Sequence, residues 1–426
     1  MKIFNKLYNT GWGLLSAMLL LSACNKLDLD PVPLTPPTQE TTPTIGTLLD
    51  NPDFSFLKAA VVRAGLAAAP GTPTLLQQLS NPAQRFTVFA PDNNAFKASG
   101  IPSEAVINGL PVPQVFAIVS YHVVPQVIKA ASIRATFPNF QYPTILNPAP
   151  SVSALLRLTT FPSVRSNGAW VNNIPIIAVD IPAVNGVIHK VAAVVAPPST
   201  DLWAKISTDA ELTYLKAAIQ RADSGVAAGG RLQDALDLAS NPSAIGSNLT
   251  VFAPNDAAFK LFLTGAITKA LIGLGLPPAT AFGQASFLVG TYGTLLLTNP
   301  YAISPVLGAT ITPTLAKGLI AYHILSSQAG NYAPPGIRVF LVNLPATETA
   351  VKTLLNSGIA AHPGVIVKAT FVSPFPGVSV VAAATVKGAA NATASNILIS
   401  FTPPFTSDLH QINGVIHKID QVLLPQ

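Results

Sequence analysis

The chain has 426 residues, more than one ordinary hydrophobic core can organise, and its length predicts two or three domains. Hydrophobic residues make up 49% and charged residues only 10%, against roughly a quarter in an average globular protein. The formal net charge of +6 is spread thinly, with no cluster of lysine and arginine among aromatic residues, so nucleic-acid binding is not predicted.

The N-terminus has the pattern of an export signal. Lys2 and Lys6 precede an apolar stretch, residues 11–21, and the small residues Ser22 and Ala23 then lead to Cys24. This pattern is typical of a signal peptide over residues 1–23, and its ending resembles the lipobox of bacterial lipoproteins. We therefore expect Cys24, the chain's one cysteine, to be lipidated and to anchor the protein to a membrane without spanning it. The alternative is an ordinary secretory leader with an incidental cysteine.

Residues 24–43 are rich in proline and threonine, which predicts an extended, semi-rigid tether behind the lipid. The first regular element follows in residues 54–69. There Leu57, Ala60, Val61 and Ala64 recur at helical spacing, so this segment is predicted to form an amphipathic helix.

Four sequence blocks occur twice in the same order, which indicates a duplicated domain. The six residues NGVIHK are identical in the two copies. The Thr-Val-Phe-Ala-Pro blocks predict a buried strand that runs into a capped helix. The paired blocks are residues 56–64 and 214–222, 87–96 and 250–259, 121–124 and 322–325, and 185–190 and 413–418.

The repeat divides the chain into a first domain at residues 44–198 and a second at 201–426, in which two insertions enlarge the second copy. Helical patterns come early in each copy, and strand-like runs such as 187–195 and 397–401 come late. This order predicts an α+β fold with an antiparallel sheet. Each Asn-Gly pair predicts a tight turn, and the lysines that end the blocks, Lys190 and Lys418, are expected on the solvated side of the strand.

The blocks TVFAPDNNAF and TVFAPNDAAF, the two Tyr-His pairs, and the endings NGVIHKVAAVVAPP and NGVIHKIDQVLLPQ together resemble the fasciclin domain. The resemblance covers both copies. It implies that each copy is a β-sandwich or wedge with several helices packed on it. It also implies an extracellular adhesion or matrix-binding module without catalysis.

The resemblance further implies a contact surface. Animal members of the family bind integrins through residues near the Tyr-His pair and an Asp-Ile element shortly before the Asn-Gly turn. An integrin is not carried over to a bacterial lipoprotein, but a contact surface is. The matching candidates for partner binding are Tyr121, His122, Asp180 and Ile181 in the first copy, and Tyr322, His323, Asp408 and Leu409 in the second.

Catalytic and metal-binding templates are missing from the sequence. It contains no GxSxG elbow, no phosphate-binding Walker loop and no HExxH pair. The histidines of the repeated blocks stand beside apolar residues, so we interpret them as buried rings that donate to backbone carbonyls. We therefore assign no catalytic, cofactor or metal residue. A carboxylate pair assembled only by the fold stays an open alternative.

Residues 270–316 carry no charge and coincide with the first insertion of the second copy. Prolines and glycines interrupt the stretch, so no run approaches the roughly 20 apolar residues that span a membrane. Two interpretations remain: the insertion packs over its own domain, or it offers an apolar surface to a partner or to a second copy.

The sequence as a whole predicts a lipid-anchored envelope protein, exposed on the outer membrane, that acts as a non-enzymatic adhesion or matrix-interaction module. Its expected partner is a surface or matrix protein or a glycan, and self-association is a further expectation. The rival predictions are a carbohydrate-binding or carbohydrate-processing envelope protein and a purely structural envelope component.

Overall fold

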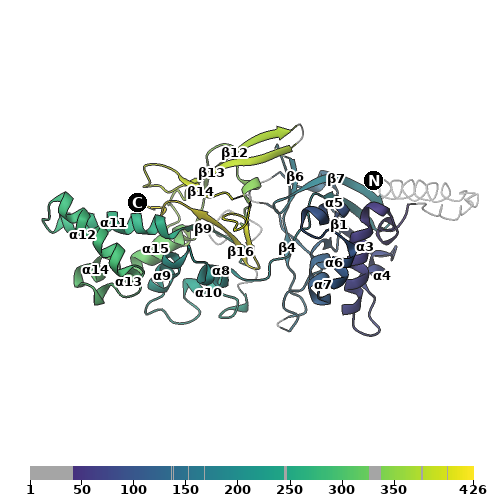
Figure 1. Cartoon of the computed structure of the whole chain (residues 1–426), viewed down its shortest axis with the longest axis horizontal. Coiled ribbons are helices and arrows are strands. Elements are labelled where there is room, and N and C mark those ends of the chain that lie inside the picture. The colour runs from purple at the N-terminus through teal and green to yellow at the C-terminus, as the bar shows by residue number, and fades with distance from the viewer. Residues whose placement is uncertain are drawn as a thin grey trace, which may run out of the picture. The chain divides into compact units, whose positions relative to one another are not determined.

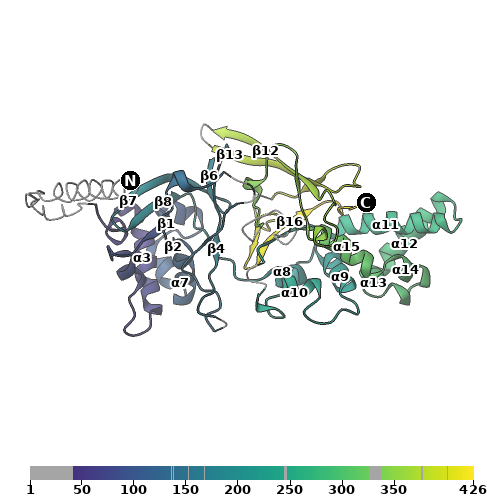
Figure 2. The ribbon, with the colours of Figure 1, turned by 180° about the vertical axis from the view of Figure 1, so that it is seen from behind.

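The structure is a computed structural model that describes residues 42–426, apart from 136, 138, 152, 167, 244–246, 326–336, 376–377 and 401. The predicted leader, Cys24 and the tether up to residue 41 lie outside the described residues. Residues 42–426 form one compact unit. Within it each half of the chain builds its own sheet and helices (Figures 1 and 2). The boundaries 44–198 and 201–426 stay predictions.

The first half places its helices before most of its strands. Its helices are α2 (Ile45–Leu48), η1 (Pro52–Phe54), α3 (Ser55–Ala64), η2 (Gly65–Ala67), α4 (Leu75–Leu79), α5 (Asn93–Ala98), α6 (Glu104–Gly109), α7 (Val112–Tyr121) and η3 (Ala130–Ser132). Its strands are β1 (Phe86–Pro91), β2 (Val123–Val124), β3 (Tyr142–Pro143), β4 (Thr159–Thr160), β5 (Pro162–Arg165), β6 (Gly168–Val171), β7 (Ile174–Ala183) and β8 (Gly186–Val191).

The second half repeats this order with larger insertions. Its helices are α8 (Leu202–Thr208), α9 (Thr213–Ala222), α10 (Leu232–Leu236), α11 (Asp256–Gly273), α12 (Pro278–Tyr292), α13 (Leu295–Thr298), η5 (Pro300–Ala302), α14 (Pro305–Thr310), α15 (Pro313–Tyr322), η6 (Leu341–Asn343) and η7 (Leu354–Ser357). Its strands are β9 (Leu249–Pro254), β10 (Ile324–Leu325), β11 (Thr349–Val351), β12 (Val365–Phe375), β13 (Val378–Lys387), β14 (Ser395–Ile397), β15 (Leu409–Gln411) and β16 (Gly414–Ile419).

The two large sheets are mixed, and β3 pairs with β4 in a separate antiparallel ribbon. The first has the strand order β2-β1-β8-β7-β6-β5, and β1 pairs parallel with β8 from Phe86↔Gly186 to Pro91↔Val191. In the second sheet β9 and β16 pair in parallel in the same way. The α+β class is confirmed. The predicted antiparallel sheet holds for the other strand pairs of each sheet, but the pairs β1–β8 and β9–β16 are parallel. The paired strands are distant in sequence and joined through helices, a connection that permits the parallel direction.

The strand predictions hold in part. The run 187–195 forms β8, which ends at Val191, because the chain then leaves the sheet for the loop that joins the two halves. Of the described residues 397–400 in the second run, Ile397 alone belongs to β14, where it pairs with Ile419. The second half contains the long hairpin β12–β13, drawn in yellow-green in Figure 1, and the first half has the shorter hairpin β5–β6.

The predicted strand-to-helix blocks form as expected. All six residues of β1 and of β9 are buried. Asp92 then caps α5 by accepting the N–H of Ala95 at 2.9 Å, and Asn255 caps α11 by accepting the N–H of Ala258 at 2.9 Å. The helix predicted in residues 54–69 is α3 with the 3₁₀ turn that follows it. At the starts of α5 and α11, the side-chain oxygens of Asp92 and Asn255 thus satisfy a backbone donor of the first helical turn.

The first insertion lengthens one helix and adds further helical elements after it, α12 among them. Where α5 has 6 residues, α11 has 18, and it packs beside α12 as a helical hairpin that both ribbon views show (Figures 1 and 2). The small face of α12, with Ala281, Ala285 and Val289, is buried. The prediction that the insertion packs over its own domain is therefore confirmed for this face.

Aromatic and polar side chains also join the two halves. Phe161 and Phe340 lie 6.2 Å apart between ring centroids, and the Arg338 guanidinium lies 5.1 Å from the Phe161 ring. Asn343 donates to the Ser163 hydroxyl at 3.0 Å. These buried contacts explain why the two halves make one compact unit.

Candidate functional site

Each NGVIHK block begins with a buried asparagine that holds the first helix of its half. Asn185 Oδ1 accepts the N–H of Ile45 at 2.8 Å, and its Nδ2 donates to the Leu79 carbonyl at 2.8 Å. Asn413 makes the same two bonds to the first residue of α8 and the last residue of α10, both at 2.9 Å. The asparagine thus fixes where two helices meet the turn.

The glycine that follows is required by close packing. Gly186 has φ +149°, and a Cβ there would lie 1.8 Å from the Phe86 carbonyl oxygen. A Cβ on Gly414 would lie 2.3 Å from the Leu249 carbonyl oxygen. The predicted tight turn is confirmed, because Ala183 pairs with Gly186 and Gln411 pairs with Gly414.

The histidine of the second block binds the aspartate that precedes the turn. Asp408 has a left-handed backbone, φ +52°, and its N–H donates to His417 Nδ1 at 3.2 Å. His417 Nε2 therefore carries the proton and donates to the Val339 carbonyl at 2.8 Å. Asp408 Oδ1 in turn accepts the N–H of Leu341 at 2.8 Å. The pair therefore holds the segment around residue 340 against β16.

The first half repeats this arrangement. Asp180 has φ +56° and donates its N–H to His189 Nδ1 at 3.2 Å. His189 Nε2 lies 2.7 Å from the Ile128 carbonyl, and Asp180 Oδ1 accepts the N–H of Ala130 at 2.9 Å. In both halves the histidine contacts a backbone carbonyl, and the aspartate accepts the N–H of the residue two positions further along the chain. We call each set of contacts an Asp-His clamp, defined by Asp180 with His189 and by Asp408 with His417.

The histidines of the Tyr-His pairs close the helices α7 and α15. His122 Nε2 accepts the N–H of Val195 at 2.9 Å, so its Nδ1 donates to the Ile118 carbonyl at 2.8 Å. His323 does the same with the N–H of Leu423 and the Leu319 carbonyl, both at 2.8 Å. Burial lowers the pKa of each ring to about 4. The prediction of buried histidines that donate to backbone carbonyls is confirmed.

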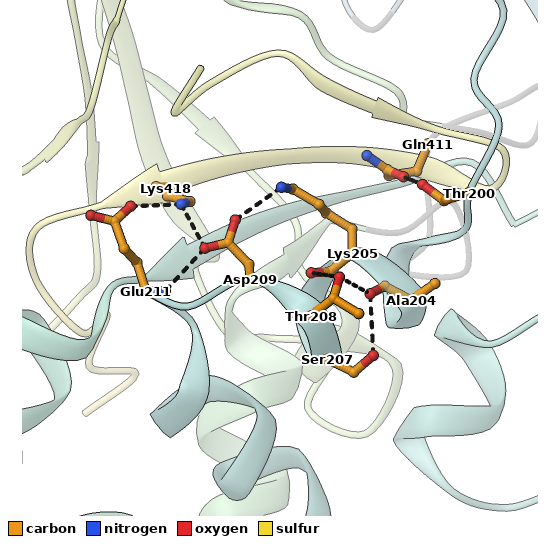
Figure 3. A network of polar contacts seen from close by, with 9 residues as sticks. All are labelled: Thr200, Ala204, Lys205, Ser207, Thr208, Asp209, Glu211, Gln411 and Lys418. Atoms are coloured by element: carbon orange, nitrogen blue, oxygen red, sulfur yellow. Dashed lines mark hydrogen bonds and ion pairs between the residues drawn. The ribbon is translucent and has the colours of Figure 1, made fainter. Parts of the chain in front are cut away.

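The sequence analysis placed the two lysines of the repeat on the solvated side of the strand, and the structure shows instead that both are largely covered. The side chain of Lys418 is only 4% exposed, and its Nζ lies 2.8 Å from Asp209 and 2.7 Å from Glu211. Figure 3 shows the lysine pointing toward both carboxylates. Lys205 also reaches Asp209, at 3.0 Å. The lysine lies inside because the segment between α8 and α9 covers this end of β16, and its two carboxylates compensate the ammonium charge.

Lys190 has a looser version of this role. Its side chain is 21% exposed, and Nζ lies 3.1 Å from Asp92, the cap of α5, and 3.9 Å from Asp53. Burial works against the ionised form of Asp92, but its hydrogen bonds and Lys190 leave its pKa below the usual value. Lys190 therefore ties β8 to the start of α5, and Lys418 ties β16 to the segment between α8 and α9. The sequence prediction was wrong because the pattern of one strand does not show which loop covers it.

The residues proposed for partner binding fall into two groups. Tyr121, His122, Tyr322 and His323 are buried, with hydroxyl and ring nitrogens bound to backbone atoms, so in this conformation they have no surface for a partner. Asp180 is exposed and Ile181 is half-buried beside it. Asp408 and Leu409 are half-buried at the wall of a cavity of about 570 Å³. Partner binding by Asp180, Ile181, Asp408 and Leu409 stays a prediction.

Several residues of this region have no signal in the repeated blocks. Arg338 is buried, donates through Nη2 to Asn248 at 2.8 Å, and places Nη1 2.7 Å from His410 Nε2. Trp170 and Phe405 line the cavity beside Asp408. Their neighbours are distant in sequence, so no local pattern could have predicted these contacts.

The first insertion also exposes apolar side chains. Phe282 and Phe287 on α12 are 58% and 66% exposed, and Leu274, before the helix, is exposed as well. No helix within the described residues is both long and apolar enough to cross a bilayer. The described residues also contain no group of three His, Cys, Asp or Glu side chains arranged to hold a metal ion.

These features define a tandem α+β protein whose repeated residues are bound to its own backbone. The fasciclin domain family model matches residues 63–197. Protein sll1483 of Synechocystis is 32% identical over 152 residues, which cover 35% of this chain and 69% of that protein. The pig (Sus scrofa) transforming growth factor-beta-induced protein ig-h3 is 31% identical over 168 residues, covering 37% of this chain and 20% of that protein.

A solved FAS1 domain pair from the insect cell adhesion molecule fasciclin I matches 88% of this chain and 98% of that chain, with 15% identity and a TM-score of 0.30. The chain belongs to the fasciclin domain family. Its second half repeats the first in block order, in strand pairing and in the Asp-His clamp.

Proposed function

We propose that this protein is a non-enzymatic adhesion module, anchored in the cell envelope by a lipid on Cys24. In this proposal the anchor lies in the outer membrane with the two fasciclin-like halves facing outward. The partner is a surface or matrix protein or a glycan. The proline-rich tether before residue 44 would give the module reach from the membrane.

The non-enzymatic role is proposed because the repeated polar residues are bound to the protein's own backbone. A catalytic site needs side chains with unoccupied donors or acceptors near a substrate. Here the histidines and asparagines of the repeated blocks form hydrogen bonds with backbone groups of the protein itself, as His122, His417 and Asn413 do.

The contact surface proposed for the first half is Asp180 with Ile181. Asp180 is exposed at the bend of β7 where the register of the β7–β8 pair shifts, and its left-handed backbone is locked by His189. A rigid, exposed carboxylate beside an aliphatic side chain suits a protein partner, because little conformational entropy is lost on binding.

Self-association is proposed through the exposed face of α12, where Phe282 and Phe287 stand on an uncharged helix. Two exposed phenylalanines on a helix without charge favour burial against another apolar surface. This feature also supports the rival role of a purely structural envelope component.

The decisive experiment labels intact cells that express the full chain, with Cys24→Ala as the matched variant. We expect a membrane-impermeant label to reach the wild-type protein, and Cys24→Ala to leave the membrane fraction. Labelled cells are then tested for adhesion to matrix proteins and glycans, with Asp180→Asn as a site variant. A wild-type protein that is membrane-bound but shielded from the label would contradict outward exposure. Outward exposure without adhesion to any surface would favour the structural role.

A further inference from the structure

The second half contains an apolar cavity that lies apart from the candidate site. Its volume is about 550 Å³, within the range of small-molecule sites. It is lined by Phe262 of α11, Leu315 and Leu319 of α15, Ile359 after η7, and Leu424 near the C-terminus. Figures 1 and 2 both show the C-terminus beside α11 and α15. We call this space the outer cavity.

The outer cavity offers a ligand mainly apolar contacts. Among the described residues that line it there is no lysine, arginine, aspartate or glutamate side chain. The one polar side chain buried in these walls is His362, whose Nδ1 accepts the N–H of Gly364 at 3.1 Å and whose Nε2 lies 2.9 Å from the Pro425 carbonyl. Both ring nitrogens are therefore engaged with the backbone. Such a lining favours an apolar, uncharged group.

A second, smaller void shares three of these walls. It measures about 40 Å³, is bordered by Phe262, Leu315 and Leu319, and has an entirely apolar surface. An apolar void stays dry, and a cavity that takes up benzene measures about 150 Å³. This inner void is therefore too small for a ring but has room for the end of a hydrocarbon chain. Leu315 is 53% exposed, so it can change rotamer and open the inner void to the outer cavity.

Gly318 leaves one wall of the outer cavity bare. It lies within α15, where glycine costs helix stability relative to alanine. A Cβ at this position would meet nothing within 4 Å, so close packing does not require the glycine. The matching residue of α7 in the first half is Ala117. The missing side chain adds space where a ligand would lie against the helix.

We propose that the outer cavity binds a single alkyl chain, the hydrocarbon tail of a fatty acid or of a membrane lipid. The chain packs along Gly318, and its end enters the inner void. Its polar head stays at the mouth, where Thr314 and Ile359 are exposed. This inference goes beyond the proposed adhesion function and does not depend on it, because binding is measured on the purified full chain.

The test uses the full chain in CHAPS, a detergent without an alkyl tail. Hexanol, octanol and decanol are titrated calorimetrically, and the heat of titration into detergent alone is subtracted. We expect one site per chain and an affinity that rises about fourfold with each buried methylene group. Cyclooctanol, with the carbons of octanol closed into a ring, should bind about tenfold more weakly than octanol, because a ring does not fit the inner void.

One variant blocks the outer cavity without removing a contact. Gly318→Leu places a side chain in the open space and also favours the helix, so it should weaken octanol binding at least tenfold while the melting temperature is unchanged or higher. Gly283→Leu is the matched control. Gly283 also lies within a helix with open space at its Cβ position, but it does not line the cavity. This control should bind octanol as the wild-type protein does.

Two further probes distinguish the sources of the chain. Decanoate represents a free fatty acid, and a phosphatidylcholine with two hexanoyl chains represents a membrane lipid. Saturable binding of either probe, lost in Gly318→Leu, supports the proposal and identifies the source.

Four results would overturn the proposal. The first is the absence of saturable heat with every alcohol. The second is cyclooctanol binding as tight as that of octanol, which would assign the cavity to a compact ring. The third is octanol binding that folded Gly318→Leu retains at full strength. The fourth is rejection of both decanoate and the phosphatidylcholine.

Discussion

His417 and Asp408 are joined through the backbone N–H of the aspartate, which donates to the imidazole Nδ1 at 3.2 Å, rather than through an ion pair. Burial lowers the pKa of His417 despite the nearby carboxylate, and burial raises the pKa of Asp408. The same 3.2 Å bond joins Asp180 and His189. The repeated histidine thus acts as a neutral bridge between a bent strand and a crossing segment.

Replacing His417 with alanine should destabilise the protein. The change leaves the N–H of Asp408 and the Val339 carbonyl without partners and creates a cavity, for a cost of about 3 kcal/mol. Chemical denaturation monitored by circular dichroism measures the effect. His189→Ala, at the matching clamp, should change stability in the same direction. A loss below about 1 kcal/mol in both variants would show that the clamps are dispensable.

Stability should fall as the pH is lowered from neutrality towards 4. Burial lowers the pKa of His122 and His323 from 6.5 to about 4, so between these values the unfolded chain binds more protons than the folded one. Each histidine should contribute a loss of about 3 kcal/mol over this interval, and its own contribution should level off below pH 4.

The control for this pH effect is the double variant His122→Gln/His323→Gln. Asp408, whose raised pKa contributes with the opposite sign, is unchanged in it. The slope of unfolding free energy against pH between 7 and 5 should be shallower in the variant. Parallel slopes in the two proteins would contradict the assignment.

Lys418→Met should cost more stability than Lys190→Met. The first change leaves buried Asp209 with Lys205 as its remaining cation, and a broken buried pair costs about 3 kcal/mol. Lys190 is more exposed, so solvent screens its pairs and the loss should be about 1 kcal/mol. Thermal unfolding of both variants at low and high salt distinguishes them, because only the exposed pair should be sensitive to salt.

Two glycine-to-alanine changes should have opposite signs. Gly186→Ala places a Cβ 1.8 Å from the Phe86 carbonyl at a backbone angle that favours glycine, and should cost about 2 to 4 kcal/mol. Gly283 lies within α12 with nothing within 4 Å of its Cβ position, so Gly283→Ala should stabilise by about 0.5 to 1 kcal/mol. The melting temperatures of the two variants test both signs at once.

The double change Phe282→Ser/Phe287→Ser should reduce self-association without loss of stability, because both side chains are exposed. Light scattering of the full chain in detergent over a range of concentrations measures the assembly. Ala285→Ser, on the buried face of the same helix, is the control and should affect stability more than assembly. A wild-type protein that stays monomeric throughout would remove the basis for the self-association proposal.

The sequence by itself determined the repeat and its local structure. The block TVFAP is a buried strand before a capped helix in both halves, and NGVIHK is a turn and a strand. Such local signals are readable because period, capping and turn residues act over a few positions along the chain. The interpretation of the block histidines as structural residues followed from their apolar neighbours.

Tertiary structure alone decided what those blocks touch. The parallel pairing of β1 with β8, the carboxylates around Lys418 and the cavity between Trp170 and Asp408 each bring together residues far apart in the sequence. A strand pattern shows which side chains alternate, but not which loop will cover a given face or what charge that loop carries. Lys418 illustrates the reason: its buried position is stable only because Asp209 and Glu211, more than half the second copy away, meet it there.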